Sequence, residues 1–378
     1  MRPGSRQNGR SSPGASPRHP RNWGSGRRIV GISRRDARGM PHSLPSDHHG
    51  LVTFTDARAQ GRQSELRAAV ARGELVSIRR GVFRAPEHVA GDRLTRSEQH
   101  RLEYVSAVHA VARTFAAPIF TSYSAIALLG LPIIGPWPAE VFILARGPHG
   151  RRRSGVIEVA RTRPVDAVEA EGCLVTSVEF SLLQLARHAP LVAASTAMDA
   201  ALHVSRFGGR LPMTTVELLG AEHDRLKPYP GSRRGEAVIR RATTLAETPL
   251  ETGSRLLIEE LGFAAPELQH ELWLPEIGKL ASLDFYWPEV DVGAEADGRG
   301  KYRGTSPRSG TSAGGSAEAA ARRATAAVIA EKDRENAIRR RVKGLDRWDW
   351  DDMLRKRPVE ERLLRLGVPR SRRRTHLM

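Results

Sequence analysis

Hydrophobic and polar positions along residues 51–88 predict two short helices and then a hairpin. Thr55 and Ser64 belong to the residue types that cap helix N-termini, and apolar residues follow Ser64 at helical spacing until Gly73. The next stretch, "ELVSIRRGVFRA", reads as two β-strands around the tip "RRG". Two short helices followed by a hairpin is the order of a winged helix-turn-helix.

The middle of the chain alternates between helical and strand-like patterns. "HRLEYVSAVHAVARTF" and "VTSVEFSLLQLARHA" have the apolar spacing of helices, the second capped by Ser177, whereas "AEVFILAR" and "GVIEVART" alternate like strands. We therefore expect an α+β module. His109, His188 and His203 lack the spacing of metal ligands, so we interpret them as ordinary core or surface residues.

The last third of the chain predicts a helix and then a sheet. "AETPLETGSRLLIEELGF" has an apolar stripe that ends at Gly262, with Glu251 at the edge of the buried face. "LQHELWL", "KLASLDFYW" and "EVDVGAEAD" read as three strands.

The last two of these strands bring carboxylates together. If Pro288 and Glu289 form a two-residue loop, Asp284 faces Gly293, and Glu295 lies on the same side of the sheet. Gly293 would leave the site uncrowded. The opposite side would be core, formed by Leu283, Phe285, Trp287, Val290 and Val292.

The length of 378 residues suits several domains, and the patterns predict an α/β (α+β), multidomain fold. We divide it into a disordered basic tail at 1–48, a winged helix-turn-helix at 49–90, an α+β middle module at 91–235, an α/β C-terminal domain at 240–368 with a low-complexity loop at 303–317, and a basic tail at 369–378. No apolar run is long enough to predict a membrane span. Cys173 is the only cysteine, which excludes internal disulfides and multi-cysteine zinc sites and suits a reducing cytoplasm.

The net charge of +18 is concentrated at the N-terminus, where residues 1–39 hold ten arginines against Asp36. Such a tail could bind nucleic acid phosphates without sequence specificity. The alternative is a non-structural leader, with Met40 as the true start.

The winged segment carries basic residues at both of the places where such a fold contacts DNA. The second helix offers Arg62, Gln63 and Arg67, and the hairpin offers Arg79, Arg80 and Arg84. The alternative is a small helical cap whose arginines are merely solvated.

Three segments give this part of the chain a resemblance to a known family. The winged segment, "TSYSAIALLGLP" and "VTSVEFSLLQLAR" together resemble actinobacterial proteins related to AbiEi-type antitoxins of type IV toxin–antitoxin systems, over residues 50–215. The resemblance implies DNA binding and autoregulation, and a cognate toxin protein as a partner.

The acids of the C-terminal domain suit a divalent cation. Carboxylates that converge from adjacent strands offer the hard oxygen ligands that Mg²⁺ or Mn²⁺ prefers, and phosphodiester hydrolysis uses such an ion to activate water. Without a cation, crowded carboxylates repel one another. We therefore expect Asp284 and Glu295 to ligate the ion, with Asp297 extending the acidic row.

The same stretch resembles the PD-(D/E)XK nuclease fold, specifically the restriction-endonuclease-like domains related to very-short-patch-repair endonucleases, over residues 245–368. The resemblance implies that Glu251 is the helix acid, Asp284 the first hairpin acid and Glu295 the second. Asp297 stands where that motif has its lysine, so Lys332 or Lys301 would have to replace it, unless both are ordinary surface lysines.

Two functions follow. The first is a metal-dependent DNA endonuclease in a toxin–antitoxin, restriction or repair context, in which Asp284, Glu295 and Glu251 hold Mg²⁺ and Lys332 or Lys301 stabilises developing charge. The second is a non-catalytic DNA-binding regulator or antitoxin with a degenerate nuclease fold, which Asp297 favours. A third and weaker alternative is a module that neutralises a toxin.

Overall fold

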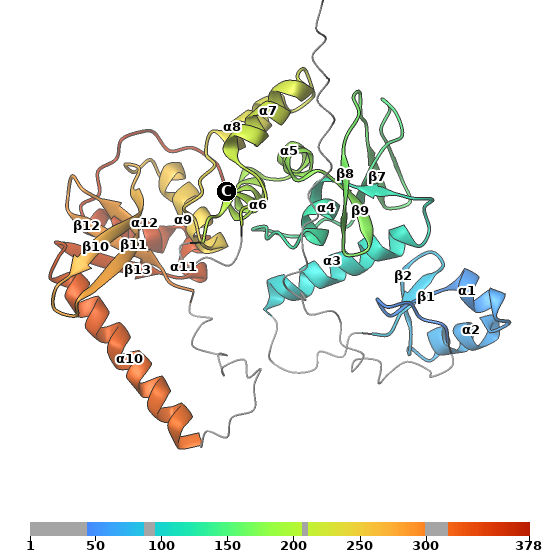
Figure 1. The fold of residues 1–378 in the computed structure, drawn as a ribbon, viewed down its shortest axis with the longest axis horizontal. Coiled ribbons are helices and arrows are strands. Elements are labelled where there is room, and N and C mark those ends of the chain that lie inside the picture. The colour runs from blue at the N-terminus through green and yellow to red at the C-terminus, as the bar shows by residue number, and fades with distance from the viewer. Residues whose placement is uncertain (1–43, 87–94, 206–210, 299–316) are drawn as a thin grey trace, which may run out of the picture.

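The computed structural model describes residues 44–86, 95–205, 211–298 and 317–378, which form three sheets and their surrounding helices (Figure 1). Lys301, most of the predicted tail at 1–48 and most of the predicted loop at 303–317 lie outside these ranges. Helices combined with mixed and antiparallel sheets agree with the predicted α/β, multidomain class. Within the described ranges, no helix is long and apolar enough to cross a membrane.

The N-terminal region is a small three-stranded antiparallel sheet with two helices. Its strands have the order β1-β3-β2. Leu66 and Ala69 of the second helix are buried against Val52 of the first strand. The elements are β1 (Leu51–Thr53), α1 (Phe54–Ala59), α2 (Gln63–Ala71), β2 (Val76–Arg79) and β3 (Val82–Arg84).

Both predicted helix caps in this region are wrong by one or two residues. Thr53, not Thr55, caps α1, because the chain leaves β1 in an extended conformation and the Thr53 hydroxyl accepts a hydrogen bond from the Asp56 N–H at 3.0 Å. Helix α2 begins at Gln63, so Ser64 lies inside its first turn. Gly73 follows the helix with a φ of +73°, as a helix-ending glycine does.

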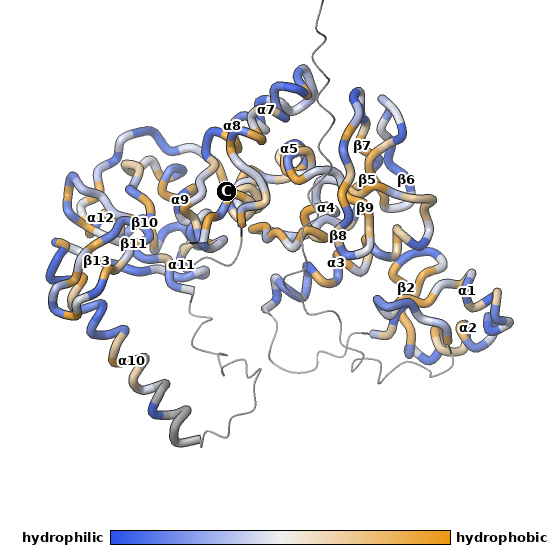
Figure 2. Tube along the Cα trace, viewed as in Figure 1, coloured by the Kyte–Doolittle hydropathy of each residue, from blue (hydrophilic) through white to orange (hydrophobic). Residues whose placement is uncertain are grey.

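The middle region is a six-stranded mixed sheet covered by helices (Figure 1). Its strands have the order β6-β7-β5-β4-β9-β8, and Figure 2 shows a hydrophobic stretch at β5. As predicted, Ser177 caps α5. The elements are α3 (Arg96–Ala112), β4 (Ile119–Phe120), α4 (Ser122–Leu128), β5 (Val141–Leu144), β6 (Arg151–Arg153), β7 (Val156–Val159), β8 (Ala167–Ala170), β9 (Cys173–Thr176), α5 (Val178–His188), α6 (Leu191–Leu202), α7 (Val216–Leu226) and α8 (Ser232–Ile239).

The C-terminal region is a four-stranded sheet with the order β10-β11-β12-β13, in which β13 runs parallel to β12. Helix α9 packs on one side of this sheet, where Leu257 and Phe285 share a core, and the end of α10 packs on the other, where Ile338 meets Leu283. The elements are α9 (Pro249–Glu260), β10 (Glu267–Leu274), β11 (Lys279–Trp287), β12 (Val292–Ala296), α10 (Ala317–Arg339), β13 (Gly344–Trp348), α11 (Trp350–Arg355) and α12 (Arg357–Arg365).

The middle and C-terminal regions share a buried junction between α6 and α9. Asp199 of α6 is 1% exposed and accepts hydrogen bonds at 2.9 Å from the Thr252 hydroxyl and the Arg255 guanidinium. Ile134 and Val192 of the middle region belong to the same apolar core as α9. A buried charge that is paired in this way would be costly to separate, so the junction holds α9 in a fixed position.

The segment 369–378, predicted to be a basic tail, lies against α9 and α12. The N–H groups of Leu377 and Met378 donate to the Glu260 carboxylate at 2.9 Å, and Arg370 and Arg374 both pair with Glu360. Its arginines therefore contribute to the packing of the C-terminal region.

Candidate functional site

The hairpin of β11 and β12 has a different register from the predicted one. Trp287 pairs with Val292, so the turn contains four residues, 288–291, in place of the predicted two. Asp291 in this turn has a φ of +55°, and its carboxylate accepts a hydrogen bond from the Tyr286 hydroxyl at 3.0 Å. The last ladder pair is Phe285 with Ala294, so Asp284 and Glu295 lie just beyond it rather than Asp284 facing Gly293.

The regular alternation of side chains also breaks at Asp284. Leu283 and Phe285 are both buried, as predicted, but Leu283 packs with α10 and Phe285 packs with α9, on opposite sides of the sheet. Gly293 does not leave open space, because a Cβ there would lie 2.6 Å from Leu283 Cδ1. The partner position on β10, Gln269, drops out of the ladder too and has a φ of +53°.

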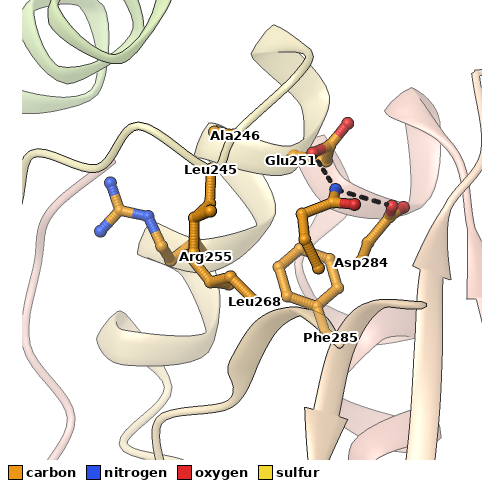
Figure 3. A pocket seen from close by; sticks show the side chains of 8 residues that line it. Leu245, Ala246, Glu251, Arg255, Leu268, Asp284 and Phe285 are labelled. Carbon is orange, nitrogen blue, oxygen red and sulfur yellow. Dashed lines mark hydrogen bonds between the residues drawn. The ribbon is translucent and has the colours of Figure 1, made fainter. Parts of the chain in front are cut away.

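This double irregularity turns Asp284 and Gln269 toward the first turn of α9. The Gln269 side-chain amide donates to Glu251 Oε2 at 2.9 Å and to Asp284 Oδ1 at 3.2 Å, as the dashed lines in Figure 3 show. The Ser282 hydroxyl donates a hydrogen bond to the amide oxygen of Gln269, Oε1, at 2.9 Å. Two acids from different elements thus converge on one amide group.

Glu251 is fixed by the start of its own helix. Thr248 caps α9, with its hydroxyl accepting from the Glu251 N–H at 3.2 Å and donating to Glu251 Oε1 at 2.8 Å. The N–H of Glu247 donates to Glu251 Oε2 at 2.9 Å. This reciprocal arrangement resembles a capping box, except that the backbone N–H comes from Glu247 and not from the cap residue Thr248, so Glu251 has a structural role whatever else it does.

Asp284 is fixed by the neighbouring strand. Its Oδ2 accepts a hydrogen bond from the Ala296 N–H at 2.8 Å, which replaces the ladder bond that β12 would otherwise make there. Burial raises the pKa of Asp284 to about 7, with further contributions from the charges of Glu251 and Glu295. Burial likewise raises the pKa of Glu251. Both acids therefore resist ionisation without a nearby cation.

Arg255 lines the same small pocket but does not supply that cation. Its guanidinium pairs with the buried Asp199, and Figure 3 shows it pointing away from Glu251 and Asp284. The pocket is otherwise closed by apolar side chains, among them Leu245 and Phe285.

Glu295 has different surroundings. One of its oxygens meets the Arg334 guanidinium of α10 at 2.7 Å, and the other meets Arg347 of β13 at 2.8 Å. Arg347 is its direct neighbour across the strands. Arg347 also lies 3.8 Å from Asp297, whose side chain is 36% exposed. The second hairpin acid is therefore already neutralised by the protein.

The structure brings some of the predicted site residues together and leaves others apart. Glu251 and Asp284 meet through Gln269, with Glu295 close enough to affect the pKa of Asp284. Lys332, predicted to replace the motif lysine, is exposed on α10, and Arg334 of the same helix reaches Glu295 instead. Among the described residues, no group of three or more acid, histidine or cysteine side chains is placed to hold a metal ion.

Sequence reasoning missed Gln269, Arg334 and Arg347. Arg347 could have been found, because a strand after α10 that pairs with β12 must place one residue beside Glu295. Gln269 and Arg334 gave no such signal, since a strand glutamine and a helix arginine are common in any exposed position.

The predicted DNA-contact residues of the winged segment fall into two groups. Arg67 and Arg80 are exposed, and Arg62 pairs with Glu65 at 2.8 Å beside Gln63 at the start of α2. The remaining two face the middle region. Arg79 lies over the Phe115 ring at 5.4 Å, and Arg84 donates to the Ser106 hydroxyl at 2.9 Å.

His109 and His188 have separate surroundings, and His109 stacks on His49 with the ring centroids 3.5 Å apart. His109 is buried with its Nδ1 atom 3.6 Å from Cys173 Sγ, and His188 bonds the Gln184 carbonyl at 2.8 Å. Burial raises the pKa of Cys173 to about 11, so this thiol is a poor nucleophile.

Comparison with known proteins adds structural similarity alone. No family model matches the chain, and no curated protein matches it significantly. A crystal structure of RV2827C protein from Mycobacterium tuberculosis is similar over 62% of this chain and 86% of that chain, with 17% sequence identity and a TM-score of 0.33. A similarity at this level carries no inference about fold or function.

Proposed function

We propose that this chain is a DNA-binding protein whose C-terminal sheet carries a divalent-cation-dependent phosphodiesterase site. The convergence of Glu251 and Asp284 on the Gln269 amide supports this proposal most strongly. Glu251 is buried and Asp284 is mostly buried, and within the described ranges no basic side chain hydrogen-bonds to either of them. Two such carboxylates close together are costly, and a cation between them would offset that cost.

The donor set fits Mg²⁺ or Mn²⁺. Glu251 and Asp284 offer carboxylate oxygens, the ligands that these hard cations prefer. A divalent ion held there would neutralise charge on a scissile phosphate and lower the pKa of a bound water. Gln269 would orient the two carboxylates, since its amide already contacts both.

Arg334 would take the part that the PD-(D/E)XK motif gives to lysine. It reaches Glu295 from α10, and a guanidinium at this place can donate to a phosphate oxygen while it keeps its carboxylate partner. Lys332 is exposed, so we assign it no role. Asp297 would remain at the rim of the site through its contact with Arg347.

DNA binding would come from the winged segment. Arg67 and Arg80 are exposed at the two places where such a fold meets a duplex, and Arg62 and Gln63 lie at the start of the same helix, α2. Arg79 and Arg84 would instead hold the hairpin against the middle region.

A second candidate function is a non-catalytic DNA-binding regulator built on the same scaffold. The two arginines on Glu295 favour it, because a carboxylate that is neutralised by 2.7 Å and 2.8 Å contacts has less need of a metal ion. Such a protein would bind DNA through the winged segment and leave it intact.

Cleavage of supercoiled plasmid in Mg²⁺ or Mn²⁺ separates the two functions. We expect the wild type to nick DNA and Asp284→Asn to lose at least about 100-fold in rate, because it removes one of two carboxylates that hold the cation. Asp351→Asn, on the exposed side of α11, serves as the control and should cleave normally. Equal nicking by wild type and Asp284→Asn would exclude a catalytic role for this site. DNA binding without nicking by the wild type would favour the non-catalytic regulator.

A further inference from the structure

The edge strand β6 presents three consecutive arginines to solvent. The side chains of Arg151, Arg152 and Arg153 are 62%, 70% and 51% exposed. The strand lies at the end of the six-stranded sheet, so only β7 pairs with it there. Its sequence pattern gave no reason to single it out, because a short arginine run also suits an ordinary solvated surface.

Two glutamates hold these arginines in place without covering them. Glu158, whose side chain is 10% exposed, contacts Arg151 at 3.0 Å and Arg153 at 2.9 Å, and Glu140 pairs with Arg152. Three guanidinium groups therefore share two carboxylates and keep a net positive charge. A guanidinium has five donors in a fixed fork, so donors remain for an external anion after one carboxylate is bound.

The aromatic ring of Phe115 joins this strand to the hairpin of the winged segment. Arg153 of β6 lies over the ring at 5.2 Å and Arg79 of β2 lies over the same ring at 5.4 Å. The two guanidinium groups are thus no more than about 11 Å apart, the sum of these distances. Figure 2 shows β2 and β6 on the same side of the molecule.

We propose that β6 is a second phosphate-binding element, which contacts the backbone of the duplex held by the winged segment. This inference rests on the proposed DNA binding of that segment. A duplex carries one charge for about every 1.7 Å of its axis, so its phosphates are closely spaced. Because Arg153 of β6 lies within about 11 Å of Arg79 in the hairpin, a duplex that contacts the neighbouring Arg80 would also present phosphates to β6. The contact is to the backbone and carries no sequence preference.

The test compares the full chain with the variant Arg151→Gln/Arg152→Gln/Arg153→Gln. Binding to a labelled duplex of mixed sequence is followed by fluorescence anisotropy between about 50 and 200 mM salt. We expect the slope of log affinity against log salt to become shallower by about two to three units, since each lost phosphate contact removes about 0.9. A matched control, Arg225→Gln/Arg233→Gln/Arg240→Gln, removes the same charge from exposed positions on α7, on α8 and directly after α8, and should change the slope by less than about one unit.

The outcomes distinguish the strand from the winged segment. If the wild type binds duplex DNA and the β6 variant keeps the wild-type slope, β6 is not in the interface, and its arginines only keep a sheet edge from pairing with another chain. That result would leave the proposed DNA binding intact. If the wild type does not bind duplex DNA at all, both proposals fail. Size-exclusion chromatography and circular dichroism verify that the variant remains folded and does not self-associate.

Discussion

Asp284 and Glu295 belong to the same hairpin and are both predicted from sequence to ligate a cation, yet their electrostatic surroundings in the structure are opposite. Asp284 is mostly buried, and the hydrogen bonds that it accepts from the described residues come from neutral donors, the Gln269 amide and the Ala296 N–H, with Arg334 acting on it through its charge alone. Glu295 receives two guanidinium groups. The difference shows that proximity of acids in sequence does not define a cation site. The carboxylate without a basic partner is the one that a cation would stabilise, and the paired one is already part of the protein's own charge balance.

The largest effect should come from breaking the charge balance at Glu295. Glu295→Ala leaves Arg334 and Arg347 without a shared carboxylate, and removal of one partner of a buried ion pair costs about 3–5 kcal/mol. Because these arginine side chains are 29% and 24% exposed, we expect the lower end, about 3 kcal/mol in the free energy of unfolding. Urea denaturation at neutral pH measures it.

Glu289→Ala, in the exposed turn of the same hairpin, is the matched control for this change. It should stay within about 0.5 kcal/mol of the wild type. A loss at Glu295 no larger than that of the control would show that the two arginines are held by other contacts, and would remove the contrast between the two acids.

A smaller effect should appear in the pH dependence of stability. The folded pKa of Asp284, about 7, is above its unfolded value, so its stabilising contribution is complete below the unfolded value and is lost as pH rises toward 7. A pKa shift of this size corresponds to about 3 kcal/mol between about pH 4 and pH 7, and because Asp284 keeps some contact with solvent we expect the wild type to lose about 2 kcal/mol relative to Asp284→Asn. Thermal unfolding in metal-free buffer measures the difference.

Saturating Mg²⁺ should reverse most of that loss in the wild type and leave Asp284→Asn unchanged, because only the ionised carboxylate holds the cation. If wild type and variant keep a constant difference across this pH range, then Asp284 is not perturbed in the way we describe.

Much of the site's framework could be predicted from sequence. The cap at the start of α9 follows from "TPLE", and the shared burial of Phe285 and Trp287 follows from their alternation. These features depend on local chemistry and on period-two patterns, which sequence displays directly.

The geometry that distinguishes the two acids could not be predicted. Gln269 and Asp284 both drop out of the backbone ladder between β10 and β11, which redirects their side chains. Neither residue type indicates such a position in a sequence. Arg334 comes from a helix far along the chain, so its contact with Glu295 depends on how α10 packs. The four-residue turn depends on the left-handed conformation of Asp291, which a proline-glutamate pair does not indicate.

The most direct test of the central claim is a calorimetric titration of the metal-free full chain with Mn²⁺ near pH 7.5. The account predicts one cation per chain, with affinity reduced at least about tenfold in Asp284→Asn and reduced much less in Glu295→Gln. Equal Mn²⁺ binding by wild type and Asp284→Asn, or binding that depends on Glu295 alone, would contradict the assignment of the cation to Asp284 and Glu251.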